Sequence, residues 1–119
     1  MKHEVSWDAE HGCVRFTVHG PVVVDEARAM TVELERILEG KPRRHLLVDH
    51  RGSPGALPVE TRRFFQTDAP QLDKLAFFGM SNLNRIAARI AVSITGQAGH
   101  TNFFKTEADA LAWLAKPET

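Results

Sequence analysis

The stretch from residue 24 to residue 49 decides the fold, because an amphipathic segment is followed there by a short apolar run. Residues 24–38 read VDEARAMTVELERIL and residues 46–49 read LLVD. Apolar side chains in the first segment recur at spacings of three and four, which predicts a one-sided helix that Gly40 and Pro42 end. A short apolar run entered from a helix indicates a buried strand in a parallel arrangement. The stretch therefore predicts the helix and second strand of a βαβ unit.

Upstream of this helix the pattern predicts a β-hairpin. Residues 3–7 alternate weakly, residues 13–18 alternate through Val14, Phe16 and Val18, and the turn-rich DAEHG lies between them. Gly20 and Pro21 close the second strand, because proline cannot donate to a sheet ladder. The hairpin would thus supply the strand that enters the βαβ unit.

Downstream, helices and strands continue to alternate. Residues 58–69 predict a helix that Pro70 ends, and the apolar run at residues 75–78 predicts a buried strand that Gly79 ends. Leu83, Ile86, Ala87, Ile90 and Ile94 form one apolar stripe, which predicts a long helix capped by Ser81 or Asn82.

The last two elements are a short strand and a short helix. Residues 100–105 contain Phe103 and Phe104 and predict the strand. Thr106 with Asp109 three residues later resembles a capping box and starts the helix that Pro117 stops. The order is ββαβαβαβα, so we expect an α/β fold in which a mixed sheet of four to five strands packs against about four helices.

Composition narrows the function classes. The chain has 119 residues, with 15 Lys plus Arg against 15 Asp plus Glu, so we expect one domain over residues 1–119 and no nucleic-acid partner. No apolar run is long enough for a transmembrane segment. The one cysteine, Cys13, cannot form an internal disulfide, and the first eight residues do not form a signal peptide, so we expect a cytoplasmic protein. Cys13 itself is expected to be a buried apolar side chain.

Four features together resemble a known family. An opening hairpin ends in Gly20 and feeds a helix, residues 46–49 lead into Arg51-Gly52, residues 75–79 precede a long apolar helix, and residues 104–114 read FKTEADALAWL. The chain resembles the SpoIIAA-like family, a branch of the STAS/SEC14-like group of small bacterial proteins. The resemblance implies a STAS-like fold and, for most members, no known activity.

One departure from the family pattern concerns phosphorylation. The sporulation regulators that give the fold its name are phosphorylated on a serine in an Asp-Ser-Ser-Gly type motif after the central strand. Here residues 49–55 read DHRGSPG. Ser53 is the only hydroxyl in this loop and Pro54 follows it, so Ser53 is either a phosphorylation site or a turn-forming serine.

Residue spacing disfavours a metal site and an active site. A helical zinc site needs His at i and i+4, and the six histidines do not have this spacing, so scattered surface or loop histidines and no metal are expected. Asp49, His50 and Ser53 are the residue types of a hydrolase triad, but their spacing does not fit a nucleophile elbow. His100 is the only candidate base in a distant loop. We therefore expect no enzyme, no catalytic residues and no cofactor. Asp49 is expected to cap a turn or to pair with Arg51.

Aromatic residues and arginines suggest a ligand site as an alternative. Phe64 and Phe65 are adjacent on a helix, so both can hardly point into one core, and one could line a groove against Leu83 or Met80. The other interpretation is that these rings are interhelical core residues and that the arginines are separately solvated. The tentative ligand-binding set is Phe64, Phe65, Phe78, Met80, Arg62, Arg85 and Arg89.

Taken together, the sequence favours a regulatory or interaction module of STAS type without catalysis. Its partner would be a second copy of itself, in a homodimer, or a regulatory protein. The alternative is a binder or sensor of a small apolar or lipid-like molecule in a groove lined by phenylalanines.

Overall fold

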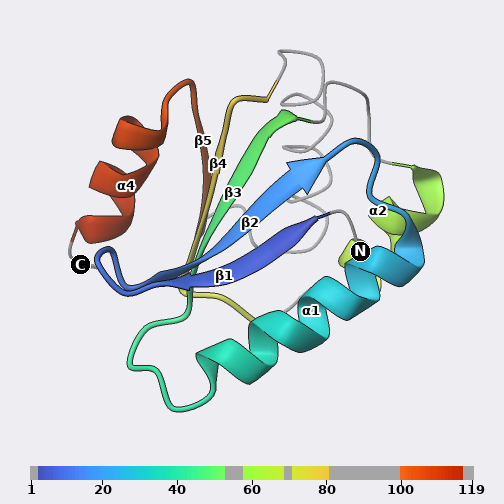
Figure 1. The fold of residues 1–119 in the computed structure, drawn as a ribbon, viewed down its shortest axis with the longest axis horizontal. Helices are drawn as coiled ribbons and strands as arrows, with labels where there is room; N and C mark the ends of the chain where they lie inside the picture. Colours follow the sequence, from blue (N-terminus) through green and yellow to red (C-terminus); the bar gives the residue numbers. More distant parts are fainter. Residues whose placement is uncertain (1–2, 53–57, 69–70, 81–99, 117–119) are drawn as a thin grey trace.

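The computed structural model describes residues 3–52, 58–68, 71–80 and 100–116, without the side chains of residues 62 and 66. Its five strands form one sheet in the order β1-β2-β3-β4-β5 (Figure 1). The first pair is antiparallel and the other three pairs are parallel. The strands are β1 (Glu4–Asp8), β2 (Cys13–His19), β3 (His45–Gly52), β4 (Lys74–Phe78) and β5 (Thr101–Phe104). The mixed five-stranded sheet confirms the sequence expectation.

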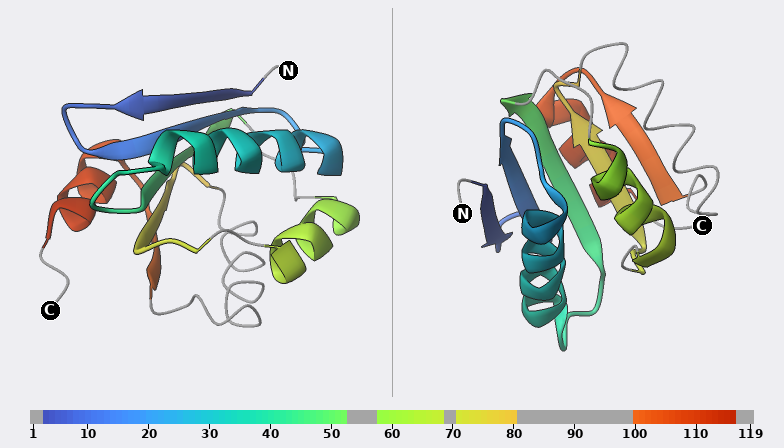
Figure 2. Two further views of the ribbon diagram at one scale, coloured as in Figure 1. Left: turned by 90° about the horizontal axis from the view of Figure 1, so that it is seen from below. Right: turned by 90° about the vertical axis from the view of Figure 1, so that its right-hand side faces the viewer.

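Helices cover both faces of this sheet. The helices α1 (Val24–Leu38) and α2 (Val59–Asp68) pack on one face, and α4 (Glu107–Ala115) packs on the other (Figures 1 and 2). Within the described residues there are three helices; the fourth one expected from the sequence falls on residues 81–99, which lie outside them. No helix in the described ranges is long and apolar enough to cross a membrane.

The two faces of the sheet carry two separate apolar clusters, because successive side chains of a strand point to opposite sides. On β4, Leu75 and Phe77 pack with the cluster beneath α1 and α2, whereas Ala76 and Phe78 belong to the cluster beneath α4. The first cluster contains the helix residues Ala27, Met30, Leu34, Leu38 and Phe64. Ala27, Met30, Leu34 and Leu38 follow one another at the spacings of three and four that predicted this helix, and Ile37 packs against the cluster.

The βαβ unit forms as the sequence predicts. α1 occupies the predicted residues 24–38, and Gly40 has a φ of +79°, a conformation that a side chain would strain. Asp25 and Glu26 lie in the first turn of α1, where negative charge is favoured by the helix dipole.

The central strand is longer than the apolar run that predicted it. β3 extends from His45 to Gly52, because Gly52 pairs with His19 of β2 beyond an irregularity in the register. At this close approach a Cβ on Gly52 would lie 2.6 Å from the Val18 carbonyl oxygen. His45 and His50 are therefore strand residues and are buried, which corrects the expectation that they lie on the surface or in loops.

Both ends of α4 are fixed by polar contacts. At its start, the Thr106 hydroxyl accepts a hydrogen bond from the Asp109 backbone N–H (3.2 Å), which confirms the predicted cap. At its end, the buried Lys74 Nζ of β4 donates to the Trp113 and Lys116 carbonyl oxygens (2.9 and 2.6 Å). The same ammonium lies 5.1 Å from the centre of the Trp113 ring.

Candidate functional site

Two residues of the rejected hydrolase site, Asp49 and His50, do not point toward each other, and the third, Ser53, lies outside the described residues. Asp49 accepts hydrogen bonds from Arg51 at its backbone N–H (3.1 Å), Nε (3.0 Å) and a terminal guanidinium nitrogen (2.7 Å), as expected from the sequence. These hydrogen bonds lower the pKa of Asp49. His50 is 3% exposed and points to the opposite face of the sheet, because it is the next residue of the strand. Asp49 is therefore already committed to an ion pair, away from His50.

A second set of charged groups joins the hairpin to α4. Arg15 Nε donates to Asp8 Oδ2 (2.7 Å), and another guanidinium nitrogen of Arg15 lies 2.6 Å from Glu107 Oε1. Burial raises the pKa of Asp8, but hydrogen bonds from Arg15 and His11 outweigh it and lower the pKa to about 2. The side chain of Asp8 is 11% exposed, so the contact is shielded from water. We therefore interpret these ion pairs as contacts that stabilise the fold by joining the hairpin to α4.

The histidines do not form a metal centre within the described ranges, where no group of three or more potential ligands occurs. His3 and His19 are neighbours across the hairpin, because the His19 backbone N–H donates to His3 Nδ1 (3.0 Å). His3 is buried rather than on the surface, because Glu26 of α1 covers it at 3.4 Å from Nε2. His19 is exposed and lies 3.0 Å from Glu4.

Cys13 is fully buried beneath α4, as the sequence predicts. Burial and the nearby charge of Asp8 raise the pKa of the thiol to about 11. A thiol that stays protonated and has no exposed surface is a poor nucleophile.

The phenylalanines of the predicted ligand groove separate into two layers. Phe64 and Phe65 of α2 have ring centroids 5.3 Å apart, and both meet the cluster beneath α1. Phe64 is a buried member of the cluster, whereas Phe65 packs against the cluster and remains partly exposed, so only one of the two rings lies fully in the core. Phe78 is 1% exposed and lies beneath α4, so it cannot line a groove with Phe64.

The other predicted site residues are not brought together by the described part of the chain. Met80 is partly buried after β4. Ser53, Arg85 and Arg89 lie outside the described residues, and so does the side chain of Arg62. Phe77, which the sequence analysis did not include in the set, stacks on Phe103 with ring centroids 5.1 Å apart, and both rings are partly exposed.

An exposed apolar surface that the sequence analysis missed lies where α1 and α2 begin. Val23 and Val59 are 49% and 52% exposed, and Pro21, two residues before Val23, is exposed too. We call these three residues the valine surface. The starts of the two helices lie on the same side of the molecule (Figure 2), and the buried Thr61 hydroxyl of α2 holds them together by donating to the Val22 carbonyl oxygen (2.6 Å).

The valine surface could have been recognised in the sequence from Val23, an apolar residue at the start of a predicted helix. This residue is the N-cap of α1 and makes no side-chain capping hydrogen bond. Ser, Thr, Asp or Asn normally fills such a position, and valine is among the poorest choices. An apolar residue directly before VDE, the start of a predicted helix, could therefore have drawn attention to this end of the chain.

The arrangement is that of a small mixed α/β domain with helices on both faces of a five-stranded sheet. The SpoIIAA-like family model matches residues 13–115. The chain therefore belongs to the SpoIIAA-like family, as its resemblance implied.

A similar solved structure supports the fold. An uncharacterized protein with a SpoIIAA-like fold from Shewanella loihica PV-4 matches with a TM-score of 0.68 and 24% identity, over 95% of this chain and 92% of that chain. A protein of unknown function from Arthrobacter sp. FB24 is 24% identical over 96% of this chain and 100% of that chain, but its TM-score of 0.34 is too low to support a shared fold. A search of curated proteins found no match.

Proposed function

We propose that this SpoIIAA-like domain is a non-catalytic regulatory module of the cytoplasm that acts by binding another protein. The observation that carries the proposal is the valine surface, since Val23 and Val59 are about half exposed and Val23 occupies the N-cap position of α1, where a capping side chain would favour folding. Exposed apolar side chains held on rigid elements are typical of protein interaction sites.

The polar residues support a binding function rather than catalysis. The carboxylates of Asp8 and Asp49 are engaged by arginines, and Cys13 is buried with a raised pKa. A general base or nucleophile must instead be free to reach a substrate. In the described part of the chain these groups are engaged in structural contacts, which supports surface contact as the means of action.

In-cell photo-crosslinking tests the proposal directly. Val59 would be replaced by benzoylphenylalanine in the full chain and expressed in the native host, with the same replacement at the exposed Val32 of α1 as the matched control. We expect one discrete cross-linked protein from position 59 and none from position 32, and a complex of defined stoichiometry when that protein is purified and mixed with this chain. The absence of any adduct from position 59 would contradict the proposal.

A homodimer is the form of this proposal in which the partner is a second copy. Light scattering after size exclusion distinguishes the two forms, because a dimer has twice the 13.3 kDa mass of the chain. In a homodimer, the cross-linked species would contain only this chain. A monomeric mass at high concentration would instead leave a different regulatory protein as the partner.

A second candidate function is the binding of an apolar or lipid-like molecule. It rests on three partly exposed aromatic residues, which are Phe65 of α2, Phe77 of β4 and Phe103 of β5. Native mass spectrometry of protein from its host would give an added mass that organic extraction removes and that Phe77→Ala abolishes. Protein of unmodified mass under gentle ionisation would rule this function out.

A further inference from the structure

We propose that His3 is a pH-dependent latch between the sheet and α1. The neutral ring is bound to the end of β2, and the protonated ring moves to Glu26 of α1. The inference concerns contacts within the domain, so it does not depend on the proposed function. It follows from the burial of the ring, the bonding of its two nitrogens and the charges around it.

The His3 side chain is fully buried between elements that are far apart in sequence. His3 directly precedes β1, and its side chain has no exposed surface. Its Nδ1 faces the end of β2, and its Nε2 faces the first turn of α1. A buried polar atom that loses a hydrogen bond cannot replace it with water without a structural change. A change in the bonding of this ring must therefore move the ring or its neighbours.

The contact with β2 determines which ring nitrogen carries the proton. The His19 backbone N–H donates to Nδ1 at 3.0 Å, so Nδ1 is unprotonated and the proton of the neutral ring is on Nε2. Nε2 has no hydrogen-bond partner in the described part of the chain, although Glu26 Oε2 lies 3.4 Å away. A charge-assisted hydrogen bond is shorter, at about 2.7–2.9 Å. The neutral ring is therefore held by β2 and is only near α1.

A second proton on the ring would change both contacts in the same direction. The proton must bind to Nδ1, which then becomes a donor facing the His19 N–H, so this hydrogen bond is lost and the two donors repel each other. The ring also becomes positive, and the Glu26 carboxylate, whose side chain is only 21% exposed, attracts it. Repulsion from β2 and attraction to α1 both move the ring towards Glu26.

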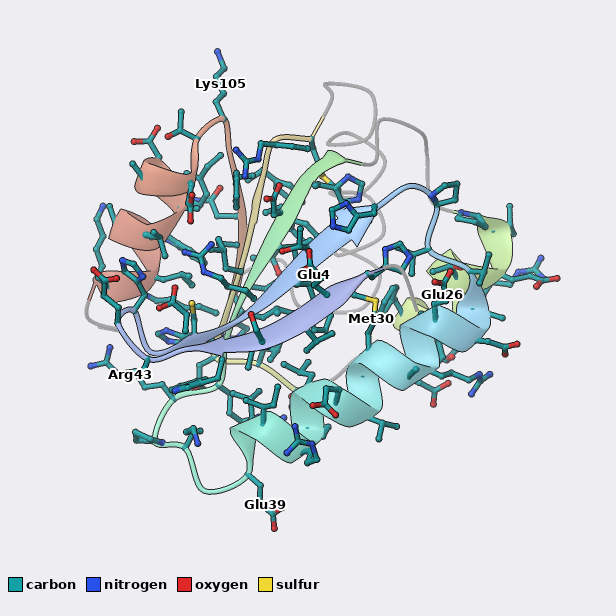
Figure 3. All side chains as sticks on the ribbon, in the orientation of Figure 1. Glu4, Glu26, Met30, Glu39, Arg43 and Lys105 are labelled. Carbon is teal, nitrogen blue, oxygen red and sulfur yellow. The ribbon has the colours of Figure 1, made fainter. Side chains whose placement is uncertain are left out.

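The other titratable groups near this end of the sheet are accounted for. The Glu4 carboxylate and the His19 ring form a separate pair at 3.0 Å, and both side chains are at least half exposed. His50 of β3 is buried, and β2 lies between β1 and β3. Figure 3 labels Glu4 on β1 and Glu26 at the start of α1. Glu26 is therefore the described charge that faces Nε2, and the His19 ring is the second histidine for which an experiment must control.

NMR spectroscopy of the isotope-labelled full chain tests the latch between about pH 8 and pH 5, the range in which histidines change charge. Ring nitrogen shifts of His3 report which nitrogens carry protons, and hydrogen exchange, corrected for the intrinsic rate at each pH, reports the His19 N–H bond. At the upper pH we expect the His3 proton on Nε2 and a protected His19 amide. At the lower pH we expect two ring protons, about a fivefold loss of His19 protection, and new contacts between the ring and Glu26.

Matched variants assign the transition to the latch. His3→Asn keeps an acceptor for the His19 N–H but cannot take up a proton in this range, so protection of the His19 amide should change less than about twofold. Glu26→Gln removes the attracting charge, so the contacts between the ring and residue 26 should not form in acid. The controls are Asp25→Asn, an exposed carboxylate in the same turn, and His19→Gln, which keeps the backbone donor. Both should retain the wild-type transition.

Other outcomes overturn the inference. It is wrong if Nδ1 carries the His3 proton at the upper pH, if the His19 amide stays protected in acid, or if His3→Asn shows the same transition as the wild type. Loss of the transition in His19→Gln would assign it to the exposed His19 ring, and ring contacts that persist in Glu26→Gln would remove α1 from the latch. If His3→Asn does not fold, the wild type and the other variants still decide between these outcomes.

Discussion

The starts of α1 and α4 differ although both N-cap residues have extended backbones. At α4 the Thr106 side chain accepts a hydrogen bond from Asp109, and at α1 the Val23 side chain makes no cap. Glu107 in the first turn of α4 binds Arg15 of the sheet, whereas Asp25 in the first turn of α1 faces solvent beside an exposed valine. The comparison teaches that side-chain contacts stabilise the start of α4, whereas the start of α1 lacks a side-chain cap and exposes an apolar residue.

The largest expected difference between the two regions comes from truncating an apolar residue in each. Leu114 of α4 is 2% exposed and packs with Leu47, Ala76 and Phe78. Leu114→Ala should lower the free energy of unfolding by about 2–5 kcal/mol, through lost burial and the cavity left behind. Val59→Ala at the valine surface should change it by less than about 0.5 kcal/mol. Urea denaturation of both variants checks the comparison, and similar losses from both would contradict it.

Acid should weaken the contacts that fasten α4 to the hairpin. The folded-state pKa of Asp8 is about 2, below its ordinary value of 3.8. The contribution of Asp8 is therefore complete above about pH 4 and is lost as the pH falls towards 2, and it amounts to roughly 2 kcal/mol. Denaturant unfolding across this range measures it. Asp8→Asn should have a flatter profile there, and parallel profiles for the two proteins would show that Asp8 is not responsible.

Removing the α4 cap should have a smaller effect. Thr106→Ala removes the acceptor for the Asp109 N–H and should destabilise the protein by about 1 kcal/mol. Thr106→Ser keeps a hydroxyl at the same position and serves as the control. Thermal or urea unfolding gives both values, and equal losses in the alanine and serine variants would mean that the cap is not the cause.

Much of the fold can be predicted from the sequence because the deciding signals are periodic. The spacing of Ala27, Met30 and Leu34 places α1 correctly, and the alternation in β2 identifies its buried face. The ends of β3 were less predictable, because His45 and His50 are polar residues whose burial depends on neighbouring strands and helices. Tertiary contacts therefore decide where this central strand begins and ends.

The candidate site could be predicted only in part. The pairing of Asp49 with Arg51 can be predicted because these residues lie only two positions apart in the chain. Such local patterns do not reveal that the sheet separates Phe78 from Phe64, or that the starts of α1 and α2 meet. The second of these depends on the hydrogen bond between Thr61 and Val22, residues far apart in sequence.

The most direct test of the central claim is a single replacement, Val23→Ser, with stability and binding measured on the same protein. Serine supplies the missing cap acceptor, so the free energy of unfolding should rise by about 0.5–1 kcal/mol. Loss of the exposed apolar side chain should at the same time weaken the complex with the partner protein that cross-links at position 59. A variant that is more stable and binds less would support a surface maintained at the expense of folding. A variant that binds as well as the wild type, or is less stable, would contradict it.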